Sequence, residues 1–147
     1  NTPHKVYTYV QPRIGIPILH IADAGGQAAP KQKLKRLGLL GTLPVVQGDF
    51  IAHRIQDEHG VEVVIPMRSD RVTMHRLVAQ ELTRGIMSET GRQFTLEAMD
   101  RLRDRGVDGI ILGCTELPLL LEDTSYPLPL LDTTRLHTEM VVDFILG

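Results

Sequence analysis

Short runs of apolar residues alternate with longer stretches in which apolar positions recur every three or four residues. The short runs are rich in Val, Ile and Leu, which is typical of strands that are buried on both faces. They lie at residues 16–21, 37–40, 61–65, 107–112 and 128–131. Because strands that alternate with amphipathic helices form βα units, this order predicts an α/β fold with a parallel sheet.

The longer stretches predict helices that each bury one apolar stripe. They cover residues 45–59, 70–84, 91–105 and 136–146. Residues 22–36 predict a further helix, which Gly25, Gly26 and Pro30 would interrupt. The expected architecture is an open parallel sheet of about four strands flanked by helices.

The composition narrows the classes of partner. Of 147 residues, 42% are apolar and 23% are charged, with a net charge of −2 at pH 7 and one cysteine. No long block carries one sign of charge, so binding to nucleic acid or to an anionic membrane is not expected. The longest apolar runs are far shorter than the roughly 20 residues that span a bilayer. One cysteine cannot form an internal disulfide, and we expect a cytoplasmic protein.

Cys114 is the residue best placed for chemistry. It follows the apolar run 107–112 and Gly113, and it precedes a stretch in which Pro118 suits the first turn of a helix. Ligands of open parallel sheets bind beyond the carboxyl ends of the strands, where this turn is expected. A free thiol has a pKa of about 8.5, which a helix start would lower. Cys114 is therefore a candidate nucleophile or base; the alternative is a small buried apolar residue.

The histidines give a weaker signal. Six are scattered along the chain, and no pair has the H-E-x-x-H spacing, so no metal site is expected. His20 and His137 come nearest to predicted strand ends, although a structural hydrogen bond is favoured for both. Asp132 follows the last predicted strand and is expected to cap the final helix. Three histidines are expected to face solvent: His53, His59 and His75.

Four short motifs occur in order along the chain. They are Asn-Thr-Pro-His at 1–4, Gly-Leu-Leu-Gly-Thr at 38–42, Gly-Cys-Thr-Glu-Leu-Pro at 113–118 and Asp-Thr-Thr-x-Leu-His at 132–137. Together they resemble the aspartate/glutamate racemase family, and the glutamate after Cys-Thr is similar to its aspartate racemase branch. The resemblance spans the whole chain and implies the last two-thirds of a protein with two similar α/β lobes. It implies three parts: a remainder of the first lobe (1–37), the second lobe (38–131) and a segment that crosses back to the first (132–147).

The resemblance also implies roles for individual residues. In that family the active site lies between the lobes, and two groups act on opposite faces of the substrate α-carbon. Cys114 would be one catalytic acid and base, and the opposing residue would lie just before Asn1. Contacts with a small amino-acid substrate are implied for Asn1, Thr2, Pro3, Thr42, Thr115 and Glu116. No cofactor and a homodimer are further implied, and these 147 residues alone are expected not to racemise an amino acid.

Two other functions stay open at this point. A one-cysteine relative, such as a dicarboxylate decarboxylase or cis-trans isomerase, would need Cys114 but not its opposing group. A non-catalytic protein that binds acidic metabolites would need neither group as an acid or base. Exchange of the α-hydrogen with solvent distinguishes a racemase from such a binding protein.

Overall fold

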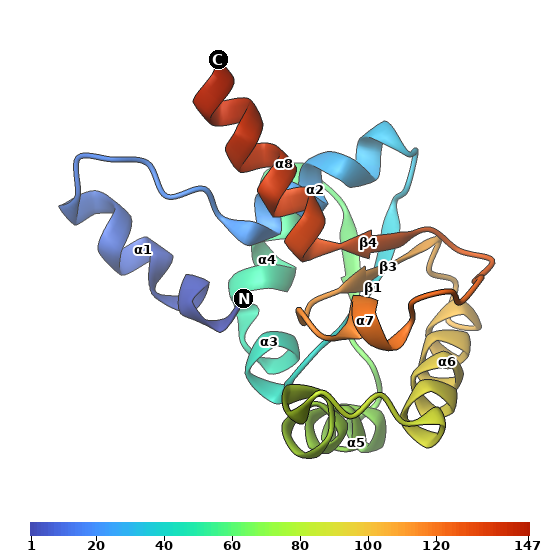
Figure 1. Ribbon diagram of the computed structural model, residues 1–147. Coiled ribbons are helices and arrows are strands. Elements are labelled where there is room, and N and C mark those ends of the chain that lie inside the picture. Colours follow the sequence, from blue (N-terminus) through green and yellow to red (C-terminus); the bar gives the residue numbers. More distant parts are fainter.

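The computed structural model describes residues 1–147 and contains one sheet of four parallel strands (Figure 1). The strands are β1 (Arg36–Leu40), β2 (Glu62–Val64), β3 (Gly109–Leu112) and β4 (Leu130–Asp132). Their order across the sheet is β2-β1-β3-β4, so that β1 and β3 are the central strands. The predicted α/β class and the parallel sheet are confirmed.

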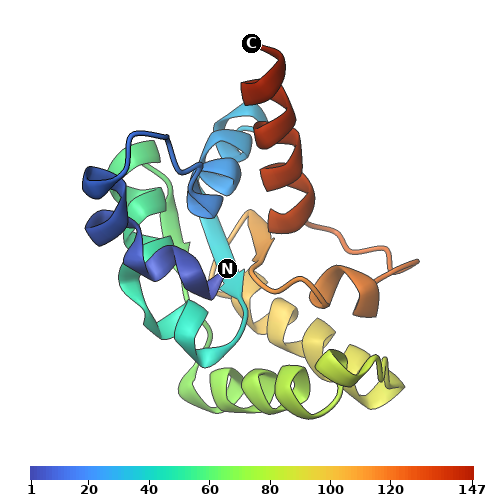
Figure 2. The ribbon, with the colours of Figure 1, turned by 60° about the vertical axis from the view of Figure 1, so that its left-hand side comes forward.

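Helices cover both faces of the sheet (Figures 1 and 2). One face is covered by α2 (Ile21–Lys31), α3 (Leu43–Gln47), α4 (Asp49–His59) and α8 (Thr133–Leu146). The other is covered by α5 (Arg68–Gln80), α6 (Glu89–Arg103) and α7 (Leu117–Leu120). The chain starts with η1 (Thr2–Val6), α1 (Tyr7–Val10) and η2 (Gln11–Arg13), and η3 (Leu82–Arg84) follows α5. None of the helices combines the length and the apolar character that crossing a membrane requires.

Side chains of the central strands alternate between the two faces, because successive Cβ atoms of a strand point in opposite directions. Leu37, Leu39 and Ile111 pack with residues of α2 and α4, whereas Ile110 and Leu112 pack with residues of α5 and α6. All five are at most 2% exposed. This burial on both faces explains why the strands appear as continuous apolar runs in the sequence.

The strand predicted at 16–21 is wrong. Residues 16–20 form no regular element, and Ile21 begins α2. A strand needs a neighbour to pair its backbone N–H and C=O groups, and the sheet does not extend to this segment. The side chain of Gln11 pairs with it instead: its Nε2 donates to the carbonyl of Ile16 at 3.1 Å, and its Oε1 accepts from the amide of Ile18 at 2.6 Å.

Two details of the predicted helices are also wrong. The helix expected over 45–59 is divided at Gly48 into α3 and α4. The expected interruption of residues 22–36 is absent, since α2 runs without a break through Gly25, Gly26 and Pro30, but the helix ends at Lys31 and Arg36 already belongs to β1. A Cβ on Gly26 would lie 2.1 Å from the ring of His59, so a glycine there lets α2 and α4 pack closely. The helices predicted at 70–84, 91–105 and 136–146 are confirmed with shifted ends.

Candidate active site

The candidate site lies where three neighbouring strands end. Leu40 of β1 is paired with Leu112 of β3, and Leu112 is paired with Asp132 of β4. The polar residues that follow these strands therefore lie at one edge of the sheet. They are Thr42 after β1, Cys114 after β3 and Thr133 after β4. The N-terminus lies beside this edge (Figure 2), so residue 1 joins the group.

Two glycines bring the ends of β1 and β3 close together. The amide of Gly113 donates to the carbonyl of Leu40 at 2.8 Å. A Cβ on Gly113 would lie 2.7 Å from that carbonyl oxygen, and one on Gly41 would lie 3.2 Å from the carbonyl oxygen of Gly113. Side chains at these positions would push the two turns apart. The glycines thus fix the distance between the turns that carry Thr42 and Cys114.

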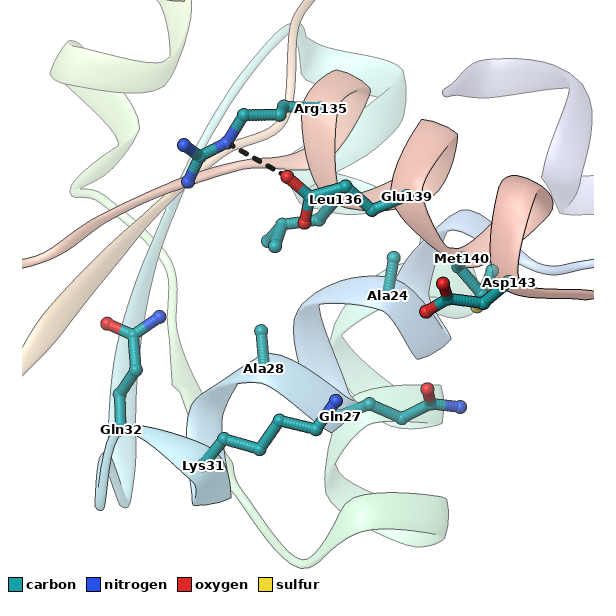
Figure 3. Close-up of a pocket in the computed structure, with 10 residues that line it drawn as sticks. All are labelled: Ala24, Gln27, Ala28, Lys31, Gln32, Arg135, Leu136, Glu139, Met140 and Asp143. Atoms are coloured by element: carbon teal, nitrogen blue, oxygen red, sulfur yellow. Dashed lines mark ion pairs between the residues drawn. The ribbon is translucent and has the colours of Figure 1, made fainter.

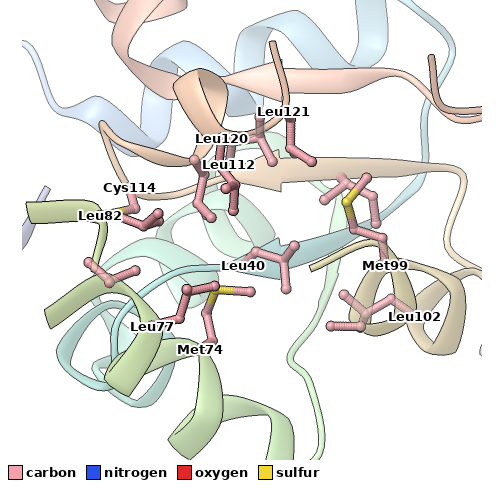
Figure 4. Packing of buried hydrophobic residues seen from close by; sticks show 14 of the residues in the cluster. Leu40, Met74, Leu77, Leu82, Met99, Leu102, Leu112, Cys114, Leu120 and Leu121 are labelled. Carbon is pink, nitrogen blue, oxygen red and sulfur yellow. The ribbon is translucent and has the colours of Figure 1, made fainter. Parts of the chain in front are cut away.

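Cys114 lies at the margin of the hydrophobic core that α5, α6 and α7 form with the sheet (Figure 4). Its side chain is 8% exposed, and its Sγ donates a hydrogen bond to Oε2 of Glu116 at 2.8 Å. Burial, and then the hydrogen bond to Glu116, raise the pKa of Cys114 to about 12. The same hydrogen bond holds the pKa of the Glu116 carboxyl below its ordinary value. In the free protein Cys114 is therefore a neutral thiol.

The expected lowering of this pKa by a helix start is wrong. The helix α7 has four residues and begins at Leu117, three positions after Cys114. So short a helix has few aligned peptide dipoles, and their effect is confined to its first turn. A carboxylate at 2.8 Å outweighs it.

Asn1 is hydrogen-bonded to the turn that carries Cys114. Its Nδ2 donates to the carbonyl of Gly113 at 2.5 Å and to Oγ1 of Thr133 at 3.4 Å. Its Oδ1 is buried and has no hydrogen-bond partner. Thr133 was not among the expected site residues, although its position directly after the last predicted strand was a usable signal. The expected role of Asp132 is confirmed, because its Oδ1 accepts from the amides of Thr134 at 2.8 Å and Arg135 at 3.2 Å.

None of the other expected substrate-contact residues forms a hydrogen bond with the thiol of Cys114, which donates to Glu116. Thr2 and Thr42 are half-buried, whereas Pro3 and Thr115 are exposed. The hydrogen bonds of Cys114 and Asn1 go to other partners. The side chains that the structure brings together are those of Cys114 with Glu116, and of Asn1 with Thr133.

Two of the histidines, His20 and His137, have structural partners, whereas His75 is half-buried and its Nδ1 is buried without a hydrogen-bond partner. Nδ1 of His20 accepts from the amide of Ala22, and Nε2 of His137 donates to the carbonyl of Leu19 at 2.8 Å, so the expected structural bonds are confirmed. His53 is exposed as expected. The expectation for His59 is wrong: its side chain is 16% exposed, and Nε2 lies 3.1 Å from Oδ1 of Asp23. No group of three or more His, Cys, Asp or Glu side chains has an arrangement that could hold a metal ion.

A surface groove lies between α2 and α8, away from Cys114 (Figure 3). It encloses about 330 Å³ over a floor that includes Ala24 and Ala28. Arg135 and Glu139 form an ion pair at 3.7 Å on its rim. None of the expected site residues lines this groove. Pro3 lines a separate pocket of about 200 Å³ beside α1.

The sequence profile of one protein family, Asp/Glu/Hydantoin racemase, matches residues 1–141. The chain belongs to this racemase family. The resemblance found in the four motifs is thereby confirmed.

Several racemases are similar to this chain. A glutamate racemase of Hydrogenobaculum sp. (strain Y04AAS1) is 28% identical over 127 residues, which are 82% of this chain. The broad specificity amino-acid racemase RacX of Bacillus subtilis (strain 168) is 25% identical over all 147 residues. The chain spans 44% and 63% of the lengths of these two relatives.

Solved structures of the racemase family share the fold. The crystal structure of a candidate Asp/Glu racemase from Yersinia pestis superposes with a TM-score of 0.94 at 38% identity. That of an aspartate racemase homologue from Pyrococcus horikoshii OT3 gives 0.88 at 28% identity. Both matches cover 100% of this chain and 64% of the solved chain. The proposed boundaries of the lobes, 1–37, 38–131 and 132–147, stay a prediction.

Proposed function

We propose that the complete protein containing this chain is a cofactor-independent amino-acid racemase of the aspartate/glutamate type. In this proposal Cys114 is the acid and base on one face of the substrate α-carbon. The observation that supports it most directly is the hydrogen-bonded pair of Cys114 and Glu116 beside Asn1, in a chain of the racemase family. A thiol, a carboxylate and an amide at one strand-end edge are suited to hold a small zwitterion.

The reaction requires two groups because an α-carbon is inverted only when one face loses a proton and the other gains one. In one direction the opposing base takes the α-proton, and the S–H bond of Cys114 breaks as its proton passes to the other face. Cys114 is left as a thiolate, which takes the α-proton when the opposite enantiomer reacts. The neutral thiol of the free protein is the state that donates.

We expect substrate binding to lower the pKa of Cys114, so that the thiol can act as a base. The pKa of Cys114 is raised by its burial and by the negative charge of Glu116. A bound ammonium group beside Glu116 would neutralise that charge and stabilise the thiolate. The thiol would then be deprotonated more easily in the presence of an amino acid than in its absence.

The proposal includes no pyridoxal phosphate, as the family resemblance implies, and none of the lysines of this chain is placed as a Schiff-base lysine would be. A Schiff-base lysine is held in a desolvated pocket, which lowers its pKa. The four lysines of the chain are Lys5, Lys31, Lys33 and Lys35, and all four are exposed. The remaining implied site residues, Thr2, Pro3, Thr42 and Thr115, are proposed to contact the substrate around Cys114.

Deuterium exchange tests this proposal. The complete gene product is incubated in D₂O with each enantiomer of aspartate and of glutamate, and the α-hydrogen and the stereochemistry are followed by NMR and chiral chromatography. The wild type is expected to exchange and invert. Cys114→Ala is expected to lower inversion by about 10²–10⁴-fold, which is the usual contribution of one general acid or base.

The control is Ser125→Ala, which removes one heteroatom from an exposed loop residue and leaves activity unchanged. Circular dichroism establishes that both variants are folded. Inversion that persists in Cys114→Ala contradicts the proposed role of the thiol. Amino-acid binding without exchange in the wild type favours a binding protein, and loss of carbon dioxide or isomerisation of a dicarboxylate favours a one-cysteine enzyme.

A further inference from the structure

We infer that Thr133 is a positioning residue, whose hydroxyl fixes the orientation of the Asn1 carboxamide beside the Cys114 turn. The structural part of this inference is independent of activity, and its consequence for substrate binding rests on the proposed function. The inference is carried by the burial of Thr133 and by the directions of three hydrogen bonds.

Thr133 is held rigidly. It is the first residue of α8, directly after β4, and it is 2% exposed. The side chain of the preceding Asp132 caps α8, which fixes the backbone at this point. The Thr133 hydroxyl donates to the carbonyl oxygen of Leu112, the last residue of β3, at 2.8 Å. It therefore ties the start of α8 to the strand that leads to Cys114.

A hydroxyl has one proton, so once it donates a hydrogen bond its oxygen can only accept further ones. Because the Thr133 proton is directed at Leu112, the oxygen is left as an acceptor. The carbonyl of Gly113 is an acceptor as well. The amide group of Asn1 faces both oxygens, at 3.4 Å and 2.5 Å.

This pair of acceptors selects one of the two orientations of the carboxamide. With Nδ2 toward Thr133 and Gly113, both amide hydrogens have an acceptor. The reversed orientation would place Oδ1 against two oxygen atoms and leave Nδ2 unpaired. Oδ1 is consequently directed away from them, and it is a buried acceptor without a partner. The arrangement keeps this oxygen free for an N–H donor of a substrate.

The test of orientation follows the side-chain amide of Asn1 in the complete protein. Labelling with ¹⁵N at asparagine side chains gives one pair of amide NMR signals for each asparagine, and the pair that belongs to Asn1 is identified by its absence in Asn1→Asp. We expect these protons to exchange with water about tenfold more slowly in the wild type than in Thr133→Val, which removes one hydrogen-bond partner. Thr133→Ser, which keeps the hydroxyl, is expected to restore slow exchange.

The matched control is Thr134→Val, the same substitution at the adjacent, exposed position. It is expected to leave the asparagine signals unchanged. Equal exchange rates in the wild type, Thr133→Val and Thr133→Ser would overturn the inference. If Thr133→Val does not fold, Thr133→Ala is used in its place.

Kinetics of the complete protein test the consequence. Thr133→Val is expected to raise KM by about tenfold with a smaller change in kcat, and Thr133→Ser is expected to restore KM. A purely structural role would lower the melting temperature and leave KM unchanged, which would overturn the inference. A protein that fails to racemise contradicts the proposed function; the NMR comparison then still decides whether Thr133 orients Asn1.

Discussion

The proton of Cys114 is held by the surroundings of the sulfur. Burial removes the water that would solvate a thiolate, and the Glu116 carboxylate accepts the hydrogen bond that the thiol donates. Both effects favour the neutral form, so the free protein protects its cysteine from oxidation and alkylation. In the proposed function, Cys114 becomes reactive as a base when the ammonium group of a substrate is bound beside Glu116.

The charge of Glu116 can be tested directly. Glu116→Gln keeps the size of the side chain but removes its charge, so the pKa of Cys114 is expected to fall from about 12. Thiolate then forms at lower pH, and alkylation by iodoacetamide becomes faster between about pH 9 and pH 11. Mass spectrometry follows the reaction without ambiguity, because the chain has one cysteine.

The control for this experiment is Glu122→Gln, which removes an exposed carboxylate. Its alkylation profile should match the wild type. If the pH dependence of alkylation in Glu116→Gln is unchanged, or shifted to higher pH, the charge of Glu116 does not raise the pKa of Cys114, and burial alone determines it.

The position of Cys114 could be predicted from the sequence, but the protonation state of its thiol could not. The order of apolar run, glycine and cysteine places the thiol after a strand, and the structure agrees. The pKa of Cys114 is raised by burial and then by the hydrogen bond to Glu116, and neither the depth of burial nor the rotamer of Glu116 is encoded in a periodicity. Thr133 was overlooked for a related reason, since its partners Leu112 and Asn1 are distant in the sequence.

The turns after β1 and β3 depend on the two glycines between them. Gly113→Ala would place a Cβ 2.7 Å from the carbonyl oxygen of Leu40, and neither backbone can move without breaking the pairing of the strands. We expect it to lower the free energy of unfolding by about 1–3 kcal/mol, as measured by urea denaturation.

The comparison for this prediction is Gly15→Ala, at a position where a Cβ would meet no atom within 4 Å. That variant is expected to stay within about 0.5 kcal/mol of the wild type. If Gly113→Ala were equally harmless, the close approach of the two turns would not be a constraint on the site.

Helices and strands were predicted well where burial on both sides of the sheet leaves a continuous apolar run. Four of the five expected strands are present. The failure at 16–21 has a physical cause: apolar composition makes a segment suitable for a strand, but pairing requires a neighbouring strand. The helix α2 was underestimated because the intrinsic cost of Gly25 and Gly26 is offset by close packing on α4.

A cluster of imidazoles joins distant parts of the fold. His4 lies in η1, and the centroid of its ring lies 4.7 Å from that of His20, before α2, and 5.5 Å from that of His137, on α8. Burial, followed by the charges of His20 and His137, lowers the pKa of His4 from 6.5 to about 4. The charge of Asp23 opposes this change.

The stability of the fold is expected to depend on pH through His4. Its pKa is lower in the folded than in the unfolded chain, so the unfolded chain binds more protons between about pH 4 and pH 6.5. Stability is therefore lost as the pH falls through this window. Because His4 is only partly buried, we expect a loss on the order of 1 kcal/mol, seen as a lower melting temperature.

His4→Phe keeps an aromatic ring without a titrating group, and it is expected to weaken this pH dependence. His53→Gln, which removes an exposed histidine, is the reference variant. If the melting temperature falls equally with pH in both variants and in the wild type, groups other than His4 cause the pH dependence.

The homodimer that the family resemblance implies stays a prediction, which sedimentation of the complete protein can test.

The hydrogen bonds of Asn1 have a consequence for how the fold is made. Asn1 reaches partners that lie 112 and 132 positions later in the chain. During synthesis these partners leave the ribosome long after Asn1 does, and such nonlocal closures are slow steps of folding. The strand-end edge that carries Cys114 is thus expected to be among the last regions to assemble, so nascent or truncated polypeptides would be partly folded before this candidate site is formed.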